Sequence, residues 1–274
     1  MSKVWMVTGA TRGIGAEIVQ AGMAAGDRVM ATGRDLERLR QRWNEVPRDR
    51  IGFAQLDVAE PAHAPAAVAA ALERFGRIDV LVNNAGYGLL GNFEEIAPEA
   101  IERQFQTNVF GLMHVMRAAL PVMRRQGRGH IMNISSVGGL IGFGGAAVYC
   151  ASKFAVEGLS ASVRQEVAPF GIHVTAVEPG FIRTDFLDDS SVVYGAELDG
   201  YASARLAFAA YNHQQPGDPA RLAQSLVQLA AMPSPPAQFL GGSDAVAMAG
   251  ASLEARQAEI GQLAELSSFA DGKY

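Results

Sequence analysis

Residues 4–15, VWMVTGATRGIG, decide the fold of this chain. A short apolar run at 4–9 ends in a glycine-rich turn, and an amphipathic pattern follows at 14–25. An apolar run without alternation that leads into a helix is typical of a parallel β-strand buried on both faces. The stretch therefore predicts the first β–α unit of an α/β protein.

The same alternation of strand and helix continues along the chain. Further strands are predicted at 28–32, 51–57, 80–86, 130–136 and 172–180. Helices are predicted at 35–45, 61–75, 98–126, 149–168 and 219–231. This order favours a doubly wound parallel sheet of the Rossmann type, with helices on both faces and ligands at the carboxyl ends of the strands.

We expect residues 1–274 to form a single catalytic domain. Between about 185 and 218 the sequence becomes polar and irregular, which predicts an insertion that covers the substrate as a lid. The following segment MPSPPAQFLGGSDA, 232–245, is rich in proline and glycine and is predicted to form turns. A helical tail is predicted at about 251–266, as a C-terminal extension of the domain.

Composition limits the classes of protein and partner. Apolar residues make up 49% of the chain, which is enough for a large core, and a net charge of −5 without a basic run argues against nucleic acid as a partner. No apolar run is long enough to span a membrane, and the first residues lack the pattern of a signal peptide. The single cysteine is typical of a reducing compartment, and the five histidines lack metal-ligand spacing. We expect a cytoplasmic protein without a metal or a membrane partner.

The turn after the first strand is the candidate site for a dinucleotide. Gly9, Gly13 and Gly15 follow the pattern G-x-x-x-G-x-G. Glycine permits a tight turn and a close backbone approach, and the N-terminus of the next helix presents N–H groups and a positive dipole end to a pyrophosphate. Other β–α connections also use glycine, but the position in the first β–α unit favours dinucleotide binding.

The end of the second strand indicates which dinucleotide binds. Arg34 follows Gly33, and Arg12 lies inside the glycine loop. Two guanidinium groups suit a 2′-phosphate, which they can hold with bidentate, charge-assisted hydrogen bonds. Asp35 could instead bond the ribose 2′-hydroxyl of NAD, and Arg34 and Asp35 could simply begin a solvated helix. The pattern favours NADP(H) over NAD(H).

The stretch AAVYCASKFAVEG, 146–158, carries three groups that could react. On a helix, Tyr149 and Lys153 share one face, because residues i and i+4 are neighbours, whereas Cys150 points about 100° away. Cys150 is therefore expected to pack in the core. A nearby ammonium lowers the pKa of a phenol from its usual value of about 10. Tyr149 is the predicted general acid for reduction of a carbonyl group by hydride.

Ser135 and Ser136 end the predicted strand 130–136, where a hydroxyl can meet the tyrosine. With them the chain resembles the short-chain dehydrogenase/reductase family, in the branch with a TGxxxGIG loop and a YxxxK motif that includes NADP-dependent carbonyl reductases and hydroxysteroid dehydrogenases. The match runs from residue 3 to about 184. The residues that carry it are Thr8 to Gly15, Asn83, Asn84, Ala85, Gly86, Asn108, Ser136, Tyr149, Lys153, Pro179, Gly180 and Thr184.

The resemblance implies a role for each matching position. Tyr149 would be the acid/base, and Ser136, rather than Ser135, would hold the substrate oxygen. Lys153 would lower the tyrosine pKa and bind the nicotinamide ribose, while Asn108 would anchor a water in a proton relay. The residues implied to bind the cofactor are Gly9, Thr11, Arg12, Gly13, Ile14, Gly15, Arg34, Asp57, Val58, Asn83, Ala85, Gly86, Tyr149, Lys153, Pro179, Gly180, Ile182 and Thr184.

The substrate is expected to be an apolar and fairly bulky ketone, aldehyde or secondary alcohol. Apolar side chains in two loops and in the insertion could form the walls of its site, or could pack internally instead. They are Tyr87, Leu89, Leu90, Phe93, Leu140, Ile141, Phe143, Tyr194, Tyr201 and Phe208.

The predicted function is that of an NADP(H)-dependent oxidoreductase that reduces a carbonyl group or runs the reverse reaction. One alternative is an NAD-preferring secondary alcohol dehydrogenase. Another is a non-catalytic dinucleotide sensor, against which the complete set of Ser136, Tyr149, Lys153 and Asn108 argues. The chain runs on past the point where many tetrameric members of the family end, which argues against a homotetramer and favours a monomer or a homodimer, although a homotetramer stays open.

Overall fold

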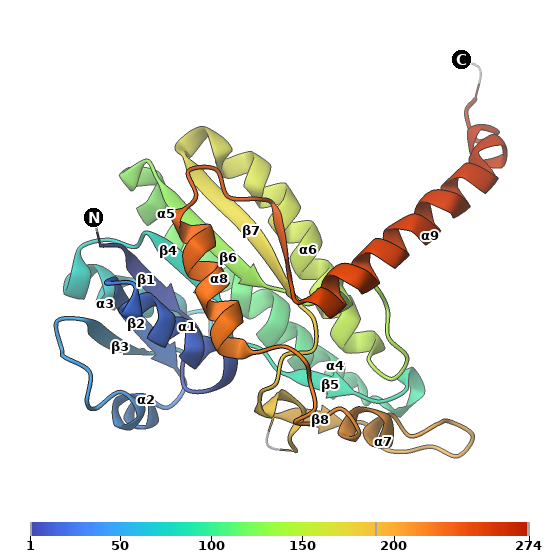
Figure 1. Ribbon diagram of the computed structural model, residues 1–274, viewed down its shortest axis with the longest axis horizontal. Helices are drawn as coiled ribbons and strands as arrows, with labels where there is room; N and C mark the ends of the chain where they lie inside the picture. The colour runs from blue at the N-terminus through green and yellow to red at the C-terminus, as the bar shows by residue number, and fades with distance from the viewer. Residues whose placement is uncertain (1, 190, 273–274) are drawn as a thin grey trace.

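A seven-stranded sheet forms the centre of the computed structural model, which describes residues 2–189 and 191–272 (Figure 1). The strand order is β3-β2-β1-β4-β6-β7-β9, and every neighbouring pair is parallel. The strands are β1 (Val4–Val7), β2 (Arg28–Gly33), β3 (Ile51–Gln55), β4 (Val80–Asn83), β6 (Gly129–Ile134), β7 (Ile172–Pro179) and β9 (Gln238–Gly241). The predicted doubly wound parallel sheet is thus confirmed.

Residues 1, 190, 273 and 274 lie outside the described residues. The predicted domain 1–274 includes all four of them, and the predicted insertion at 185–218 includes residue 190.

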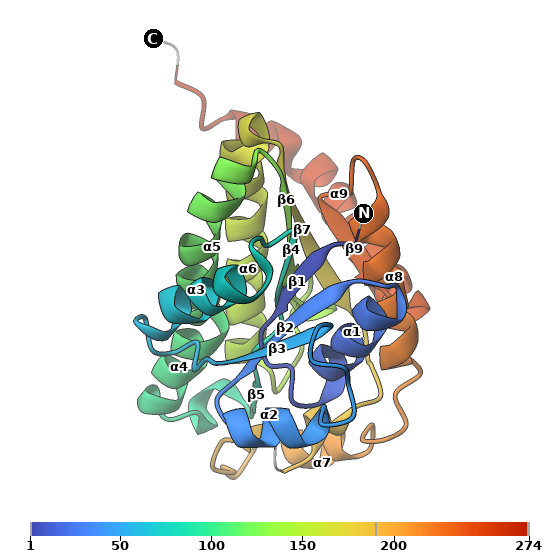
Figure 2. The same ribbon diagram turned by 90° about the vertical axis from the view of Figure 1, so that its left-hand side faces the viewer.

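Helices cover both faces of the sheet (Figure 2). One apolar cluster joins the sheet to α3, α5 and α6, and a second joins it to α1, α2 and α8. The helices are α1 (Gly13–Ala24), α2 (Leu36–Arg42), α3 (His63–Phe75), α4 (Pro98–Phe105), α5 (Leu112–Gln126), α6 (Ala147–Val167), α7 (Ala204–Ala209), α8 (Pro219–Ala231) and α9 (Ser243–Ser268). Because the strands are buried on both faces, they carry the continuous apolar runs from which the fold was predicted.

The main differences from the predicted elements have local causes. The predicted helix 98–126 contains a π-helical turn at Gln106–Gly111 between α4 and α5, an irregularity that apolar periodicity does not reveal. Strand β9 was not predicted, because it has only four residues, next to prolines on one side and Gly242 on the other. The tail helix α9 begins at Ser243, earlier than the predicted start at about 251.

The segment predicted as an insertion contains short elements that attach it to the body. Strand β8 (Val192–Tyr194) pairs in parallel with β5 (Gly88–Leu90) in a separate two-stranded sheet. Helix α7 follows, and a small apolar cluster joins Leu187 and Val192 of this segment to Leu90. The segment therefore lies beside the loops at the carboxyl ends of the main strands. That it moves as a lid stays a prediction.

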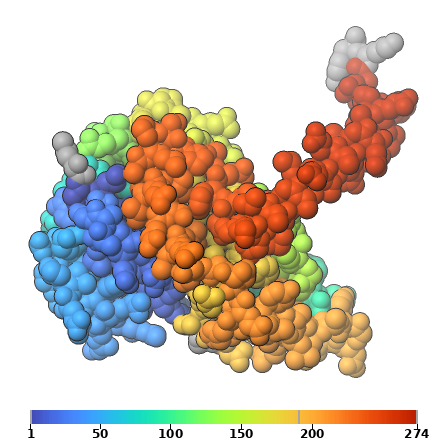
Figure 3. Space-filling view, in the orientation of Figure 1, coloured from blue at the N-terminus to red at the C-terminus, as the bar shows by residue number. Residues whose placement is uncertain are grey.

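Helix α9 projects away from the body of the molecule (Figure 1; Figure 3). Its 26 residues correspond to a rod of about 39 Å. Ala245 near its start is buried, whereas Leu253, Ile260 and Leu266 farther along are exposed. Among the helices of the described residues, none is both long enough and apolar enough to cross a membrane.

A buried histidine, His130, lies near the amino-terminal end of the central strand β6, away from the dinucleotide loop at the carboxyl ends of the strands. His130 Nε2, on β6, is 2.8 Å from Thr175 Oγ1, on β7, and the threonine hydroxyl donates to the carbonyl of Pro236 at 2.6 Å. Because that hydroxyl already donates its proton, His130 must donate to it. Burial, with smaller contributions from His173 and Arg164, lowers the pKa of His130 to about 3. The folded state therefore favours the neutral imidazole over the charged one.

Acid should destabilise the protein through His130. Its pKa in the folded state lies below the unfolded value of about 6.5, so its contribution to stability is complete above that pH and is lost as the pH falls toward 3. We expect this group to reduce the free energy of unfolding by about 1.4 kcal/mol at about pH 5.5, relative to its value above neutrality. Urea denaturation at both pH values measures the change.

The matched variants are His130→Gln and His213→Asn. The glutamine can still donate to Thr175 but does not titrate, so the pH dependence of stability should become shallower. His213, at an exposed position where its Nε2 lies 3.1 Å from a carboxylate oxygen of Asp188, is the control for replacement of a histidine elsewhere in the chain. An unchanged slope in His130→Gln would contradict the assignment.

Candidate active site

A cavity of about 1010 Å³ opens at the carboxyl ends of the main strands. It reaches from the glycine loop to the segment after β7, and most of the predicted site residues lie on its wall. Those that line it are Gly9, Thr11, Arg12, Gly13, Ile14, Arg34, Asp57, Val58, Ala85, Gly86, Ser136, Tyr149, Lys153, Pro179, Gly180, Ile182 and Thr184. The described residues contain no cluster of three His, Cys, Asp or Glu side chains that could hold a metal ion.

The glycine loop is built for close backbone packing. Gly9 and Gly13 have φ values of 67° and 56°, in the left-handed region that favours glycine. A Cβ on Gly15 would collide with the carbonyl oxygen of Gly9. Asn84 fixes the loop from β4, because its Nδ2 donates to the carbonyls of Thr8 and Gly9 at 3.0 and 3.2 Å. The conformation of the loop is therefore fixed by contacts within it and with the residue that follows β4.

The N-terminus of α1 faces the cavity and suits an anion. Within the described residues no side chain caps this helix, and its first turn holds no acidic residue. Its backbone N–H groups and the positive end of its dipole are thus directed to the site where a pyrophosphate would lie. The adjoining residues Arg12, Gly13 and Ile14 line the cavity. The local structure fits a dinucleotide.

At the end of β2 the cavity is lined by Arg34, Asp35 and Arg38. The Oδ1 of Asp35 accepts a hydrogen bond of 2.9 Å from the backbone N–H of Arg38, so this carboxylate caps α2. The guanidinium group of Arg38 was missed in the sequence, because it lies one helical turn beyond the strand end that was searched. A Cβ on the adjacent Gly33 would lie 3.0 Å from Thr11 Oγ1, so a side chain there would crowd this part of the wall.

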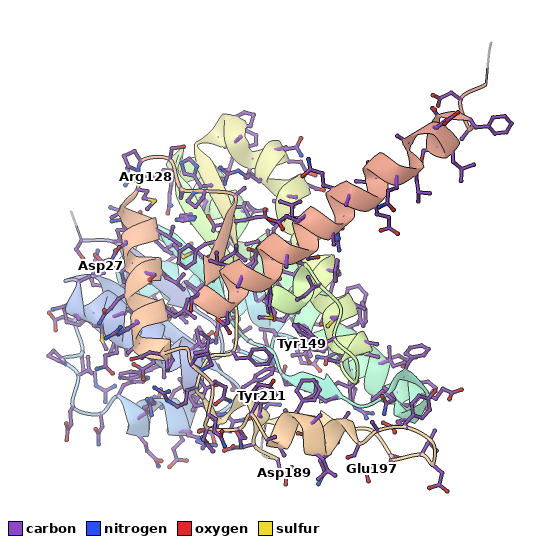
Figure 4. All side chains as sticks on the ribbon, turned by 45° about the vertical axis from the view of Figure 1, so that its right-hand side comes forward. Asp27, Arg128, Tyr149, Asp189, Glu197 and Tyr211 are labelled. Carbon is purple, nitrogen blue, oxygen red and sulfur yellow. The ribbon has the colours of Figure 1, made fainter. Side chains whose placement is uncertain are left out.

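Tyr149, Ser136 and Lys153 meet at the other end of the cavity. Tyr149 and Lys153 lie one turn apart on α6, and Ser136 follows β6. The Nζ of Lys153 is 5.7 Å from the centre of the Tyr149 ring and donates to the carbonyl of Ile134 at 2.8 Å. Tyr149 lies between the sheet and the segment that carries Tyr211 (Figure 4). The spacing expected from the helix period is confirmed.

Burial shifts the pKa values of both Tyr149 and Lys153. It raises the pKa of Tyr149 to about 12, against a lowering by hydrogen bonding with Ser136. It also lowers the pKa of Lys153 to about 8. The pKa of the phenol was expected to fall because of the neighbouring ammonium, but desolvation is the larger effect and the net shift is upward. At neutral pH the tyrosine is therefore a protonated acid.

Three predicted residues do not line the cavity. Asn83 is buried in β4, where its Nδ2 donates to Asn133 at 2.9 Å; its neighbour Asn84 lines the cavity instead. Gly15 packs beneath the loop. Asn108, in the π-helical turn, uses its amide to donate to the carbonyl and accept from the N–H of Tyr87, at 3.1 and 3.2 Å. Its side chain fixes the loop before β5, and its amide also donates to Ser152 Oγ at 3.4 Å, whose hydroxyl donates to the backbone carbonyl of Tyr149 at 2.7 Å.

Cys150 packs as expected. It is buried and belongs to the apolar cluster that joins α6 to the segment after β7. Burial raises the pKa of its thiol, which disfavours the reactive thiolate.

The apolar part of the cavity overlaps only in part with the predicted walls. Tyr87, Leu90, Phe143 and Phe208 line it. Leu89 is buried elsewhere, Phe93 is exposed, and the hydroxyl of the exposed Tyr201 donates to Glu94. Leu140, Ile141 and Tyr194 also do not line the cavity. Lining residues that the sequence analysis missed are Ala146, Phe186, Leu187, Val192 and Val193.

Gln215 is a further lining residue that sequence reasoning missed. It is 2% exposed, and among the described residues its Oε1 has no hydrogen-bond partner. Its segment lies against the chain after β7, because the N–H of Arg183 donates to the carbonyl of Gly217 and the N–H of Gly217 donates to the carbonyl of Phe181. The guanidinium group of Arg183 also donates to the carbonyl of Gln215. The signal in the sequence was weak, since Gln215 lies in the irregular stretch.

Known proteins share this architecture and these motifs. A family model described as short chain dehydrogenase matches residues 3–192. Oxidoreductase BOA17 of Botryotinia fuckeliana is 38% identical over 271 residues, which cover 97% of this chain and 98% of the relative. The crystal structure of a short-chain dehydrogenase from Streptomyces avermitilis superposes with a TM-score of 0.91 at 38% identity, over 99% of both chains.

Similar structures have been solved with nicotinamide dinucleotides. The closed form of a serine dehydrogenase complexed with NADP+ is 30% identical, with a TM-score of 0.76, and covers 86% of this chain and 93% of its own. Others were solved with NADP or with NADH.

Substitution of Gly15 should disturb the loop. A methyl group there collides with the backbone of Gly9, so Gly15→Ala should cost about 1–3 kcal/mol in stability and weaken dinucleotide binding. The control is Gly158→Ala in α6, where a Cβ would meet nothing within 4 Å and alanine is the better helix former. Thermal unfolding and calorimetric titration with NADPH measure both variants, and parental values for Gly15→Ala would refute the packing argument.

Proposed function

The chain belongs to the short-chain dehydrogenase family, and we propose that it is an NADP(H)-dependent oxidoreductase acting on an apolar ketone or aldehyde, or on the corresponding alcohol. The observation that carries the proposal is the convergence of Tyr149, Ser136 and Lys153 at one end of a cavity whose other end is a glycine loop. A proton donor and a dinucleotide cradle on one continuous surface are what hydride transfer to a carbonyl group requires.

The protein groups supply the proton and the positioning. When bound, the nicotinamide would give hydride to the carbonyl carbon or take it from the alcohol carbon. Tyr149 donates its proton to the oxygen that gains charge, and Ser136 holds that oxygen beside the phenol. A buried phenol with a raised pKa is fully protonated at neutral pH, which suits reduction. In the alcohol direction the same group must first lose its proton, so that direction is favoured by alkaline pH.

Three arginines support the preference for NADP(H). Arg12, Arg34 and Arg38 all line the cavity around the loop that would hold the adenosine ribose. A 2′-phosphate adds charge that guanidinium groups bind well. Asp35, which would serve NAD, accepts a hydrogen bond from the backbone of α2. The wall of Asp57 and Val58 would meet the adenine, and Pro179 to Thr184 the nicotinamide.

Apolar lining supports a bulky apolar substrate. Beyond Tyr149 the cavity is walled by Leu90, Phe143, Phe186 and Val192, so a hydrocarbon skeleton gains from burial there. Tyr149 and Phe186 pack with ring centres 5.8 Å apart, which places an aromatic side chain beside the proton donor.

Replacement of the tyrosine tests the chemistry. Tyr149→Phe removes the proton donor and keeps the ring, so turnover should fall by about 10²–10⁴-fold while NADPH affinity stays within a few-fold. The readout is NADPH oxidation with trans-1-decalone, a bicyclic apolar ketone. Cys150→Ala, at the buried neighbouring position, should retain turnover. Parental turnover in Tyr149→Phe would exclude it as the acid.

Cofactor preference is tested by calorimetric titration with NADPH and NADH at two salt concentrations. Parental protein should bind NADPH more tightly, and this preference should weaken with salt. Arg34→Ala should reduce NADPH affinity by about 10-fold or more and leave NADH affinity nearly unchanged. Arg40→Ala, on the helix that follows Arg34 but not on the cavity wall, is the control.

The titration and the turnover assay together separate the alternative functions. Equal or NADH-favoured binding would replace the proposal with an NAD-preferring alcohol dehydrogenase. Tight binding of either dinucleotide without turnover of any carbonyl compound or alcohol would favour a sensor.

A further inference from the structure

Two carboxyl groups lie behind Lys153, and the proposed chemistry does not use them. Glu178, on β7, is 1% exposed with both carboxyl oxygens buried, and Glu157, one turn beyond Lys153 on α6, is half-buried with Oε1 buried. Among the described residues, no donor meets hydrogen-bond geometry with any of these three oxygens. Neither residue lines the cavity.

The two carboxyl groups face each other beneath the catalytic turn. They are close enough to share a hydrogen bond when one of them is protonated. A Cβ on Gly139, three residues after Ser136, would lie 3.0 Å from Glu157 Cγ and 3.1 Å from the carbonyl oxygen of Lys153. Glu157 thus packs against the turn that carries the serine.

The charged and titratable neighbours of the pair are few. Lys153 and Glu157 come from α6, and Glu178 comes from β7. Gln238, on β9, and Ser135 add neutral polar groups. Asp244, at the start of α9, accepts from the backbone N–H of Phe181 at 2.7 Å and is turned toward that end of β7.

Two facing carboxylates with one ammonium nearby cannot both hold a charge without a large cost in free energy. Burial and the neighbouring Glu157 both raise the pKa of Glu178. Burial also raises the pKa of Glu157, but hydrogen bonding with neighbouring side chains, Ser135 first, and then the positive charge of Lys153 oppose that shift. The deeper carboxyl is therefore the one that keeps a proton.

We propose that Glu178 is protonated at neutral pH and donates to the carboxylate of Glu157, and that the negative charge of Glu157 keeps Lys153 protonated. Both glutamates are positioning residues, since they act on Lys153 and do not touch the substrate. Only the expected effect on turnover rests on the function proposed above. The shared proton itself does not depend on that function.

The consequence for turnover follows from the burial of the lysine. Burial lowers the pKa of Lys153, and the charge of Glu157 raises it. Without that charge, Lys153 loses its proton at a lower pH, and the site loses the positive charge that favours ionisation and orientation at Tyr149. The alkaline limit of activity should therefore move toward neutral pH.

Infrared spectroscopy tests the shared proton without any substrate. At neutral pH the surface carboxyl groups are ionised, so a protonated carboxylic acid gives a separate C=O band. The parental protein should show that band, and it should disappear as the pH is raised. Glu178→Gln should abolish it, whereas Glu166→Gln, at an exposed position of α6, should retain it.

The pH profile of trans-1-decalone reduction tests the effect on Lys153. In Glu157→Gln the alkaline limb should move down by roughly one pH unit. In Glu178→Gln, which leaves Glu157 charged, the limb should not move down. A merely structural role would lower turnover at every pH and leave the limb in place.

The outcomes separate the two proposals. Absence of the acid band in the parental protein at neutral pH overturns the shared proton, whether or not the protein is active. A band with no downward shift in Glu157→Gln overturns its coupling to Lys153. Failure to bind a dinucleotide or reduce any ketone would count against the proposed function alone, since the infrared result stands without it. If Glu178→Gln does not fold, the pH titration of the parental band still decides.

Discussion

The hydrogen bonds between the ends of β1 and β4 are the constraint on which the site depends. Thr8 Oγ1 accepts from the backbone N–H groups of Asn84 and Ala85, at 2.9 and 3.0 Å, and Asn84 donates back to the glycine loop. The chain continues from β1 to β2 on one side, whereas β4 leads to β6 on the other, so this is the point where the two halves of the sheet diverge. A crevice must open at such a point, and the contacts of Thr8 and Asn84 fix its floor.

Much of this arrangement could be predicted from local signals. Buried parallel strands have continuous apolar runs, the helix period brings Tyr149 and Lys153 together, and the φ values of Gly9 and Gly13 require glycine. These features depend on residues close in sequence. Their chemistry was readable because backbone geometry alone dictates the residue type or the spacing.

Features that depend on distant parts of the chain were not predictable in the same way. Which of two adjacent asparagines lines the cavity depends on where β4 ends, and the structure selects Asn84 over Asn83. The hydrogen-bond partners of the Asn108 amide depend on the π-helical turn that carries it and on the position of Tyr87. The net direction of the shift in the Tyr149 pKa depends on how deeply the ring is buried. The YxxxK spacing gives no information about that burial. Gln215 reaches the cavity only because its segment pairs with the chain after β7.

The single thiol of the chain gives the molecule a natural probe of its own opening. Cys150 is buried directly beside Tyr149 in sequence, in the cluster that joins α6 to the segment after β7. A reagent that modifies thiols can reach it only when that cluster separates, and no second cysteine competes for the reagent. The rate of labelling therefore reports the frequency with which this wall of the proposed active site opens in solution, without substitution of any residue.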